Sequence, residues 1–249
     1  VVLTEAGNLL FRPLRDGFDA FAVAIDRVRS RNTPTSITLT APVAFTSRWI
    51  IPRIERFRAR HPTLNLRLLA SNDVVDLRLG EADIAIRYGG GVYSGCHSEP
   101  LFQEKYAPVC SPRLAINNCA DLGDFPLIHT EYHHPDERTP TWSRWHSVAG
   151  ILFNHPGTQL VLNDQTDAIQ AAVAGQGVAL VSMTFAADEL ASGALRVPFG
   201  PLLEGHYFHV VVANRVPNKE KVEAVSEWLA GEAEPFLKKA VPMEYPGYS

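Results

Sequence analysis

The residues of this chain best suited to chemistry are short polar and charged side chains that follow predicted strands. Ligands of doubly wound sheets bind outside the carboxyl ends of the strands, where helix N-termini present free N–H groups. Hydroxyl and amide groups suit a carboxylate or an amide, and Arg87 suits an anion. Each residue alone is better explained as a helix cap or a turn, and it is their joint placement at strand ends that favours a ligand site. The residues at these positions are Thr46, Ser47, Asn72 to Asp76, Arg87, Tyr88, Thr130, Glu131 and Asp164 to Thr166.

Motifs of nucleophilic or metal-assisted catalysis are missing from the sequence. It has no Gly-x-Ser-x-Gly, no Ser-x-x-Lys and no His-Glu-x-x-His. The Gly89-Gly90-Gly91 run lacks the Gly-Lys-Ser/Thr ending of a phosphate loop. We interpret it as a turn whose backbone lies close to a ligand or to another part of the protein. The sequence therefore predicts no catalytic residue and no enzyme.

A histidine cluster is the feature that most resembles a metal site. His129, His133 and His134 lie near Glu131 and Asp136. No matching second pair of ligands is evident, and histidines in a loop beside a proline are usually solvated. We predict no metal and no cofactor.

Strand-like and helix-like segments alternate through most of the chain, which predicts an α/β fold with mainly parallel sheets. A strand, a helix of about twelve residues and a second strand form a first βαβ unit, and the pattern repeats later. The predicted strands are 37–41, 64–69, 83–87, 105–110, 126–129, 159–162, 178–181 and 207–213. The predicted helices are 49–60, 74–79, 165–174, 183–191 and 219–229.

The repeat of the βαβ pattern predicts two similar lobes. The strands at 105–110 and 207–213 are the expected links between them. Two crossing strands form a hinge and leave a cleft between the lobes, a usual place for a small-molecule site.

A helix is predicted at residues 4–29, with Thr4 as its N-cap. Its apolar residues recur at spacings of 4, 3, 4 and 3, which is the seam of a helix that packs on another helix. Pro13 and Gly17 weaken its first half, so a partner helix is implied. Packing against its own domain is the alternative. The seam residues are Leu14, Phe18, Phe21, Ile25 and Val28.

Composition limits the class of protein. The chain has 249 residues, 46% of them hydrophobic, and a formal charge of −4, which argues against a surface built mainly for nucleic acid or an anionic membrane. The three cysteines form no Cys-x-x-Cys pair and suggest reduced thiols in the cytosol. No apolar run approaches the roughly 18 residues that span a bilayer. We predict a cytoplasmic protein without a membrane partner.

Four motifs resemble those of LysR-type transcriptional regulators, and they occur in that family's order. Residues 2–7 (VLTEAG) resemble the end of the wing and the start of the linker helix, and 51–62 (IPRIERFRARHP) resemble the first helix of the sensor domain. Residues 83–91 (DIAIRYGGG) are similar to the subgroup that contains the glycine-cleavage activator and AmpR. Residues 171–180 (AAVAGQGVAL) resemble a helix-to-strand turn of the family.

This resemblance implies two Rossmann-like lobes joined by two crossing strands, as in type 2 periplasmic binding proteins, behind a long linker helix. The implied domains are the wing end and linker helix at 1–34, lobe I at 35–107 plus 209–237, lobe II at 108–208 and a C-terminal extension at 238–249. The implied partners are a small-molecule effector, DNA bound through an N-terminal domain absent from this chain, and further copies in a homodimer or homotetramer. The implied effector contacts are Thr46, Ser47, Asn72, Asp76, Arg87, Tyr88, Thr130, Gln165, Thr166 and Tyr207.

Two other classes of protein remain possible from the sequence. A solute-binding protein of a transport system has the same cleft, but it does not need the apolar seam at residues 4–29. A two-lobed enzyme is the other alternative, and it lacks its catalytic motifs here.

Overall fold

The computed structural model describes residues 4, 7, 10, 11, 13–15, 17, 18, 21, 35–132, 135–151, 159–216 and 218–238. In the leading segment, the described residues from Gly7 to Phe21 are helical, and the Gly7 N–H donates to Thr4 Oγ1 over 3.2 Å. This bond fits the predicted N-cap. Ile25 and Val28 of the predicted seam lie outside the described residues, as do 239–249.

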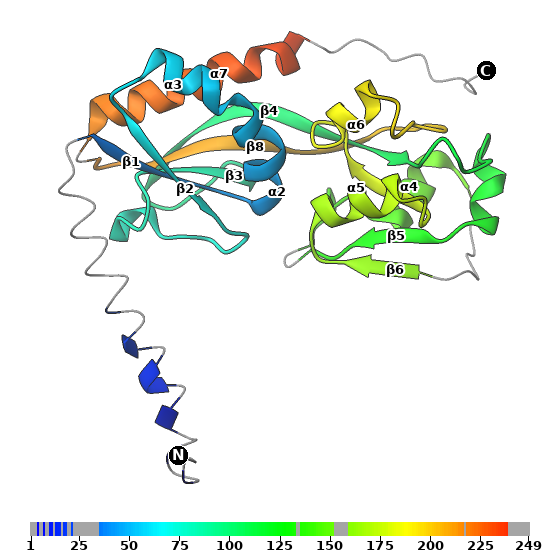
Figure 1. Ribbon diagram of the computed structural model, residues 1–249, viewed down its shortest axis with the longest axis horizontal. Helices are drawn as coiled ribbons and strands as arrows, with labels where there is room; N and C mark the ends of the chain where they lie inside the picture. Colours follow the sequence, from blue (N-terminus) through cyan, green and yellow to red (C-terminus); the bar gives the residue numbers. More distant parts are fainter. Residues whose placement is uncertain are drawn as a thin grey trace.

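Two lobes each carry a small parallel sheet (Figure 1). In lobe I, β1 (Ser36–Ala41) pairs in parallel with β2 (Asn65–Ala70) and β3 (Ile84–Gly89). In lobe II, β5 (Leu127–Thr130) pairs in parallel with β6 (Gln159–Leu162) and β7 (Val178–Ser182). The carboxyl ends of these strands in both lobes face the gap between the lobes, as the lining of the cleft described below shows.

Two long strands join the lobes. β4 (Cys96–Val109) and β8 (Leu203–Ala213) pair with each other antiparallel, and they also pair with β7 and β3 respectively. The result is one eight-stranded sheet in the order β2-β1-β3-β8-β4-β7-β5-β6. The predicted crossing strands are confirmed. The sheet is mixed rather than mainly parallel, because β4 and β8 run in opposite directions between the lobes. The residue boundaries given above for the domains stay predictions.

Helices cover the sheet. The ordinary α-helices are α2 (Val43–Phe45), α3 (Ile54–Arg60), α4 (Trp142–Ala149), α5 (Gln165–Val173), α6 (Ala187–Ala191) and α7 (Lys219–Lys238). The tighter or wider turns are η1 (Thr46–Ile50), η2 (Ile51–Arg53), η3 (Leu77–Leu79) and η4 (Cys119–Asp124). In Figure 1, α3 and α7 lie along one face of lobe I.

The first helical region differs from the prediction of one helix at 49–60. It starts at Val43 and passes through a π-helical turn (η1) and a 3-10 turn (η2) before α3 begins. Pro52 has no N–H, and its ring clashes with the carbonyl four residues earlier, so a regular α-helix cannot continue through it. A wider turn before the proline relieves that clash.

Other predicted elements also change length. β4 begins at Cys96 rather than Lys105, and α7 continues to Lys238 rather than Leu229. The predicted helix 74–79 is only the 3-10 turn η3, and the predicted helix 183–191 begins at Ala187. α4 was not predicted, although Thr141 caps its start and Gly150 ends it in the left-handed conformation.

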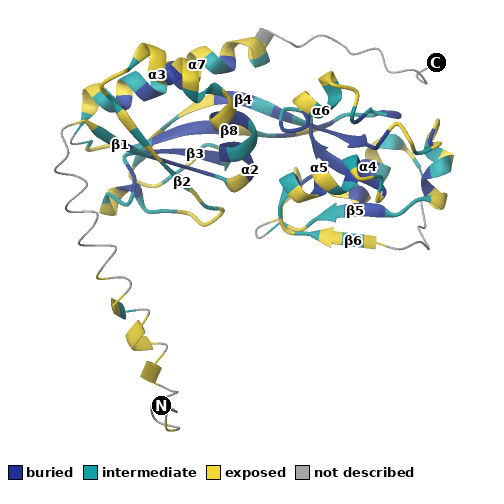
Figure 2. Cartoon of the chain, viewed as in Figure 1, coloured by how far each residue is buried: buried dark blue, intermediate teal, exposed yellow. Residues whose placement is uncertain are grey.

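The largest hydrophobic core continues from lobe I into lobe II at the joint between them. Phe45 stacks near Phe102 and Phe208 from the crossing strands, with ring centroids 6.1 Å and 4.6 Å away, and it meets Phe185 of lobe II edge-on at 6.3 Å. Figure 2 shows the buried residues concentrated in the strands, with exposed residues on the outer faces of the helices. This aromatic core fixes the end of β1 and α2 against the hinge.

Candidate functional site: the interlobe cleft

A cleft of about 300 Å³ lies between the lobes, at the carboxyl ends of all six parallel strands. Every one of these strands contributes residues at or just after its end. The lining residues are Pro42, Ala44, Ser71, Asn72, Val74, Arg87, Tyr88, Gly89, Tyr106, Thr130, Glu131, Tyr132, Asp136, Thr139, Pro140, Asn163, Asp164, Gln165, Phe185, His206 and Phe208. This is the position that the strand-end rule predicts for a ligand site.

Lobe II places an amide and a phenol at the cleft. The Gln165 side chain is held at both ends, because its Oε1 accepts from the Ser182 N–H over 2.9 Å and its Nε2 donates to Tyr132 Oη over 3.1 Å. Gln165 starts α5, whose N-terminus is capped by Asp164 through a bond of 2.7 Å from the Thr166 N–H. The cap fixes the first turn of α5 and, with it, the polar groups that face lobe I.

Lobe I supplies the opposite wall. Asn72 follows β2, and its Oδ1 accepts from the Val43 N–H over 3.1 Å, which ties the loop after β2 to the start of α2. Arg87 and Tyr88 lie near the end of β3 and also line the cleft. The wall therefore combines an amide, a guanidinium and a phenol.

Direct contacts join the two walls near the cleft. Ser47 Oγ and Thr166 Oγ1 lie 3.4 Å apart, between η1 of lobe I and α5 of lobe II. Arg48 forms an ion pair with Glu189, and both side chains are only 15% exposed. These contacts involve groups at facing helix ends, so any change in the distance between the lobes must break or remake them.

A tyrosine cluster lies beside the crossing strands. Tyr88 Oη accepts from the His206 N–H over 2.9 Å and is hydrogen-bonded to Tyr106, which is almost fully buried. Gly205 makes room for both rings, because a Cβ at this position would lie 2.5 Å from Tyr88 Oη and 2.6 Å from Tyr106 Cε2. His206 Nε2 lies 2.6 Å from Asp136 Oδ2, which links β8 to a loop of lobe II.

Glu104 lies behind this cluster on β4 and is only 1% exposed. Its Oε1 accepts from the Lys105 N–H over 2.9 Å and from Thr184 Oγ1 over 3.0 Å, while Oε2 has no partner among the described residues. Burial raises the pKa of Glu104 to about 7, and these hydrogen bonds oppose the rise only in part. The carboxyl group therefore changes charge near neutral pH, next to the hinge.

The predicted site residues divide into two groups. Asn72, Arg87, Tyr88, Thr130 and Gln165 line the cleft. Thr46, Ser47, Asp76, Thr166 and Tyr207 are not among the lining residues. Ser47 and Thr166 face each other at its edge, and Thr46 is buried beside them.

Asp76 and Tyr207 have other surroundings. Asp76 caps η3 and pairs with Arg78 over 2.7 Å. Tyr207 is 39% exposed and lies opposite Gly89 in the β3–β8 pair, on the other face of the sheet from Tyr88.

Several lining residues were not predicted. Tyr106, Tyr132, Asp136 and His206 contribute most of the polar atoms that the strand-end rule missed. Tyr132 directly follows Thr130 and Glu131, the predicted positions after β5, so extending the rule by one residue finds it. Tyr106 and His206 lie within the crossing strands, where the rule does not apply.

A metal centre is not formed by the part of the chain that the structure describes, where no three histidine, cysteine or acidic side chains gather in a suitable group. His133 and His134 of the predicted cluster lie outside that part. Within the same residues, no helix is long and apolar enough to cross a lipid bilayer.

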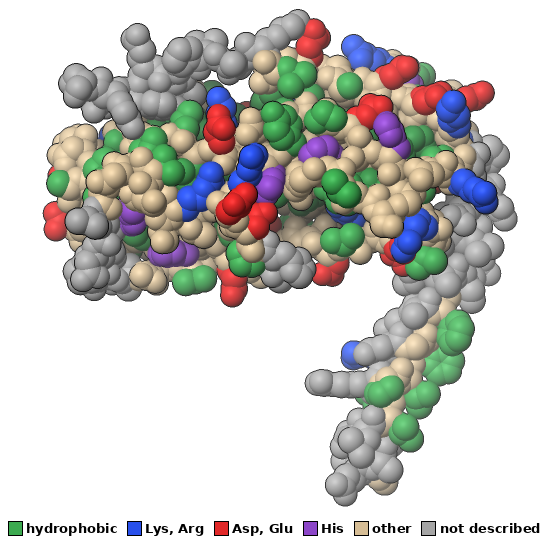
Figure 3. All heavy atoms as spheres, turned by 180° about the vertical axis from the view of Figure 1, so that it is seen from behind, with side chains coloured by type: hydrophobic (Ala, Val, Ile, Leu, Met, Phe, Trp, Pro, Cys, Tyr) green, Lys and Arg blue, Asp and Glu red, His purple; other side chains and the backbone are tan. Residues whose placement is uncertain are grey.

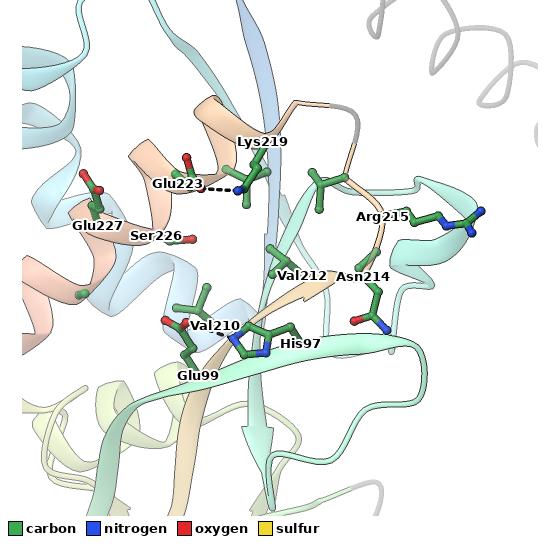
Figure 4. Close-up of a pocket in the computed structure, with 14 residues that line it drawn as sticks. His97, Glu99, Val210, Val212, Asn214, Arg215, Lys219, Glu223, Ser226 and Glu227 are labelled. Atoms are coloured by element: carbon green, nitrogen blue, oxygen red, sulfur yellow. Dashed lines mark hydrogen bonds and ion pairs between the residues drawn. The ribbon is translucent and has the colours of Figure 1, made fainter.

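A larger groove of about 960 Å³ lies elsewhere on lobe I, between α7 and the strands β4 and β8 (Figure 4). Four of its lining residues form two pairs: His97 Nε2 lies 3.1 Å from Glu99 Oε1, and Lys219 Nζ lies 3.4 Å from Glu223 Oε1. Among the described residues, no buried polar atom without a partner lies in this groove, whereas Arg87 in the cleft has one. The chemistry therefore favours the smaller cleft as the ligand site.

Two α/β lobes, two antiparallel crossing strands and a polar cleft at the strand ends define a ligand-binding fold of the type 2 periplasmic-binding-protein kind. Residues 30–234 match the LysR substrate binding domain family, and the chain belongs to this family. It is an effector-binding domain of a LysR-type regulator, and these relatives favour that class over a transport solute-binding protein.

Named relatives agree with this assignment. The chain is 31% identical over 236 residues to the HTH-type transcriptional activator AmpR of Rhodobacter capsulatus, which covers 94% of this chain and 79% of that protein. It is 27% identical over 241 residues to the glycine cleavage system transcriptional activator of Escherichia coli K12, covering 94% and 76%. The solved effector domain of AmpR of Pseudomonas aeruginosa superimposes with a TM-score of 0.68 at 30% identity, covering 81% of this chain and 96% of that domain. The predicted resemblance to this subgroup is confirmed.

Proposed function

We propose that the interlobe cleft binds a small-molecule effector and that this binding controls transcription. The observation that carries the proposal is the convergence of polar side chains from both lobes on one cleft at the strand ends. The effector contacts proposed from the cleft lining are Asn72, Arg87, Tyr88, Thr130 and Gln165. Ser47 and Thr166, which meet across the cleft edge, are proposed to report on lobe closure.

The coupling is proposed to be a shift between lobe arrangements. An effector that prefers one arrangement stabilises it by its difference in affinity, and about 1–3 kcal/mol is enough for a large change in output. The ion pair of Arg48 with Glu189 and the Ser47–Thr166 contact exist in one arrangement of the lobes. They are therefore the contacts that effector binding is proposed to strengthen or release.

The output is proposed to be DNA binding through an N-terminal domain in the full-length protein. The relatives named above are transcriptional activators, which supports this proposal and a cytoplasmic location. Pairing of the leading helices into a homodimer or homotetramer is proposed to carry the signal between subunits. No catalytic step is proposed for this chain.

A thermal-shift screen tests the cleft as the binding site. A library of amino acids, short peptides and sugar phosphates is added to the protein, and compounds that raise the melting temperature are kept. A ligand at about 100 times its Kd stabilises the folded state by about 2.7 kcal/mol. The hits are then tested on Gln165→Ala, in the cleft, and on Ser226→Ala, in the α7 groove.

The expected result is that Gln165→Ala loses the stabilisation and Ser226→Ala keeps it. The reverse pattern would move the ligand site to the α7 groove. If the stabilisation survives both substitutions, the ligand binds outside both the cleft and the α7 groove, and this result would count against the proposal.

A further inference from the structure

A second polar cluster lies next to the cleft, on the other face of the lobe I sheet. In the antiparallel pair of β3 with β8, Arg87 lies opposite His209 and Gly89 lies opposite Tyr207. Directly opposite residues place their side chains on the same face of a sheet. Tyr93, from the loop after β3, reaches this face as well, with its ring centroid 6.4 Å from that of His209 in an edge-on arrangement.

Arg87 carries a buried positive charge in this cluster that no carboxylate of the described residues neutralises. It is only 7% exposed, its Nη1 donates over a long 3.4 Å to the Ile86 carbonyl, and its Nη2 has no hydrogen-bond partner in the part of the chain that the structure describes. Among the described residues, no carboxylate lies within ion-pair distance of it. A guanidinium stays protonated in proteins, so the cost of burying this charge is not avoided by losing a proton.

Tyr93 offers a second unused donor. Its hydroxyl is buried and has no hydrogen-bond partner among the described residues. Tyr93 and Arg87 share His209 as a neighbour, because Arg87 lies opposite His209 in the β3–β8 pair and the Tyr93 ring meets the His209 ring. Burial raises the pKa of Tyr93, and the Arg87 guanidinium opposes that rise. The phenol is neutral at physiological pH and is therefore a hydrogen-bond donor that can serve an anion.

Gly91, in the Gly89-Gly90-Gly91 run, lets the backbone pass close to the His209 ring. Gly91 has a φ of +83°, and a Cβ on it would lie 2.6 Å from His209 Nε2. Only glycine allows this close approach in this conformation. Burial lowers the pKa of His209, so its ring is neutral and the positive charge of the cluster comes from Arg87.

The cluster adjoins the cleft, because Arg87 and Gly89 are also among the lining residues of the cleft. We propose that Arg87 and Tyr93 form an anion-binding subsite of the cleft, and that the effector carries a carboxylate or a phosphate group. An oxygen of that group accepts from Arg87 Nη2 and from Tyr93 Oη, and its charge neutralises the guanidinium. This inference rests on the proposed function, because it assigns the chemical class of the ligand of the same cleft.

Acetate, inorganic phosphate and the uncharged isostere acetamide are the probes for this subsite. Each is titrated at constant ionic strength into the protein and into Arg87→Met, Tyr93→Phe and Arg56→Met, the last altering an exposed arginine far from the cleft. Without any probe, Arg87→Met is expected to melt at a higher temperature than the unsubstituted protein, because it removes an uncompensated buried charge. If Arg87 has a purely structural role, Arg87→Met will instead melt at a lower temperature than the unsubstituted protein.

With acetate or phosphate, the melting temperature of the unsubstituted protein and of Arg56→Met is expected to rise. The rise should be smaller in Tyr93→Phe and absent in Arg87→Met, and acetamide should have no effect on any of them. Whichever of acetate and phosphate acts at lower concentration identifies the anion. The ¹⁵N resonance of Arg87 Nε in the unsubstituted protein should shift with the same midpoint, which gives a readout even if Arg87→Met does not fold.

The subsite is refuted if neither anion shifts that resonance, or if Arg87→Met folds and retains the anion-dependent rise. The experiments distinguish a failure of the anion subsite from a failure of the cleft as the effector site. Screening hits that need Gln165 but stabilise the protein and Arg87→Met equally would leave the cleft as the effector site and remove the anion requirement. Hits that need Arg87 but are unaffected by Gln165→Ala would keep the anion subsite and remove Gln165 from the proposed effector contacts.

Discussion

Glu104 links the charge state of a single residue to the stability of the hinge region. Its carboxyl group is 1% exposed, and its folded-state pKa is about 7 against an ordinary value of 4.5. The folded protein therefore holds a proton that the unfolded chain releases between these two values. Because the folded state binds more protons in this window, stability is expected to fall as the pH rises from about 4.5 through about 7.

The substitution Glu104→Gln is expected to remove this pH dependence. Above pH 7 the buried carboxylate costs on the order of 3 kcal/mol, since each pKa unit corresponds to about 1.4 kcal/mol. The variant should therefore unfold at a higher urea concentration than the unsubstituted protein at pH 8. At pH 5 the two midpoints should be equal. Glu204→Gln, at an exposed position of β8, is the control and should follow the unsubstituted protein. A Glu104→Gln variant with an unchanged pH profile would contradict the assignment.

For single residues, the sequence best predicted the position of side chains that lie at the end of a strand. Arg87 and Gln165 were placed at the cleft for this reason. Glu104 and Tyr106 were not, because β4 shifts its register against β8 between Gln103 and Lys105. Such an irregularity changes which face of the sheet a side chain meets, and alternation along the sequence does not reveal it.

Among the elements, α5 presents polar groups to the cleft and depends on its N-cap. The Asp164 side chain accepts from the Thr166 N–H over 2.7 Å. Asp164→Ala is expected to cost about 1 kcal/mol of unfolding free energy, a typical value for an N-cap. In a protein of this size the melting temperature should fall by roughly 2–4 °C.

Asp164→Asn separates the cap from the charge, since asparagine caps as well as aspartate does. It should keep nearly the full melting temperature. Equal losses in Asp164→Ala and Asp164→Asn would assign the stabilisation to the carboxylate's charge, not to its hydrogen bond.

Helices and strands were predicted well where the apolar pattern alone determined them. They were predicted less well where the apolar pattern conflicted with a proline. β1, β2 and β3 agree with the predicted strands to within a few residues, because each is a short apolar, β-prone run bounded by polar residues or glycine. The first helix of lobe I was placed too late. Its apolar residues at Trp49 and Ile50 hide the earlier start at Val43, and Pro52 makes the turns between them irregular.

For the whole molecule, the repeated βαβ pattern was enough to predict two lobes and two crossing strands. It was not enough to predict the contacts between lobes, because these depend on how the two sheets are twisted relative to each other. The pair of Arg48 with Glu189 joins residues far apart in sequence, and neither lies in a recognisable motif. Such contacts are set by tertiary packing alone.

The leading helix carries the last prediction, which concerns assembly. Leu14, Phe18 and Phe21 are 55%, 70% and 70% exposed in the single chain. Figure 3 shows apolar side chains along the described part of this segment. Large exposed apolar side chains at heptad spacing are buried when a second helix packs on them. Phe18→Asp combined with Phe21→Asp is therefore expected to convert the oligomer into a smaller species.

Light scattering coupled to size exclusion measures this change in mass. Gln170→Asp, on the exposed side of α5, is the control for added charge and should leave the mass unchanged. The double variant should keep its melting response to ligands of the cleft, because the helix and the cleft share no residue. A double variant with the mass of the unsubstituted protein would show that the subunits associate through other surfaces, and the leading helix would then have to pack on its own domain.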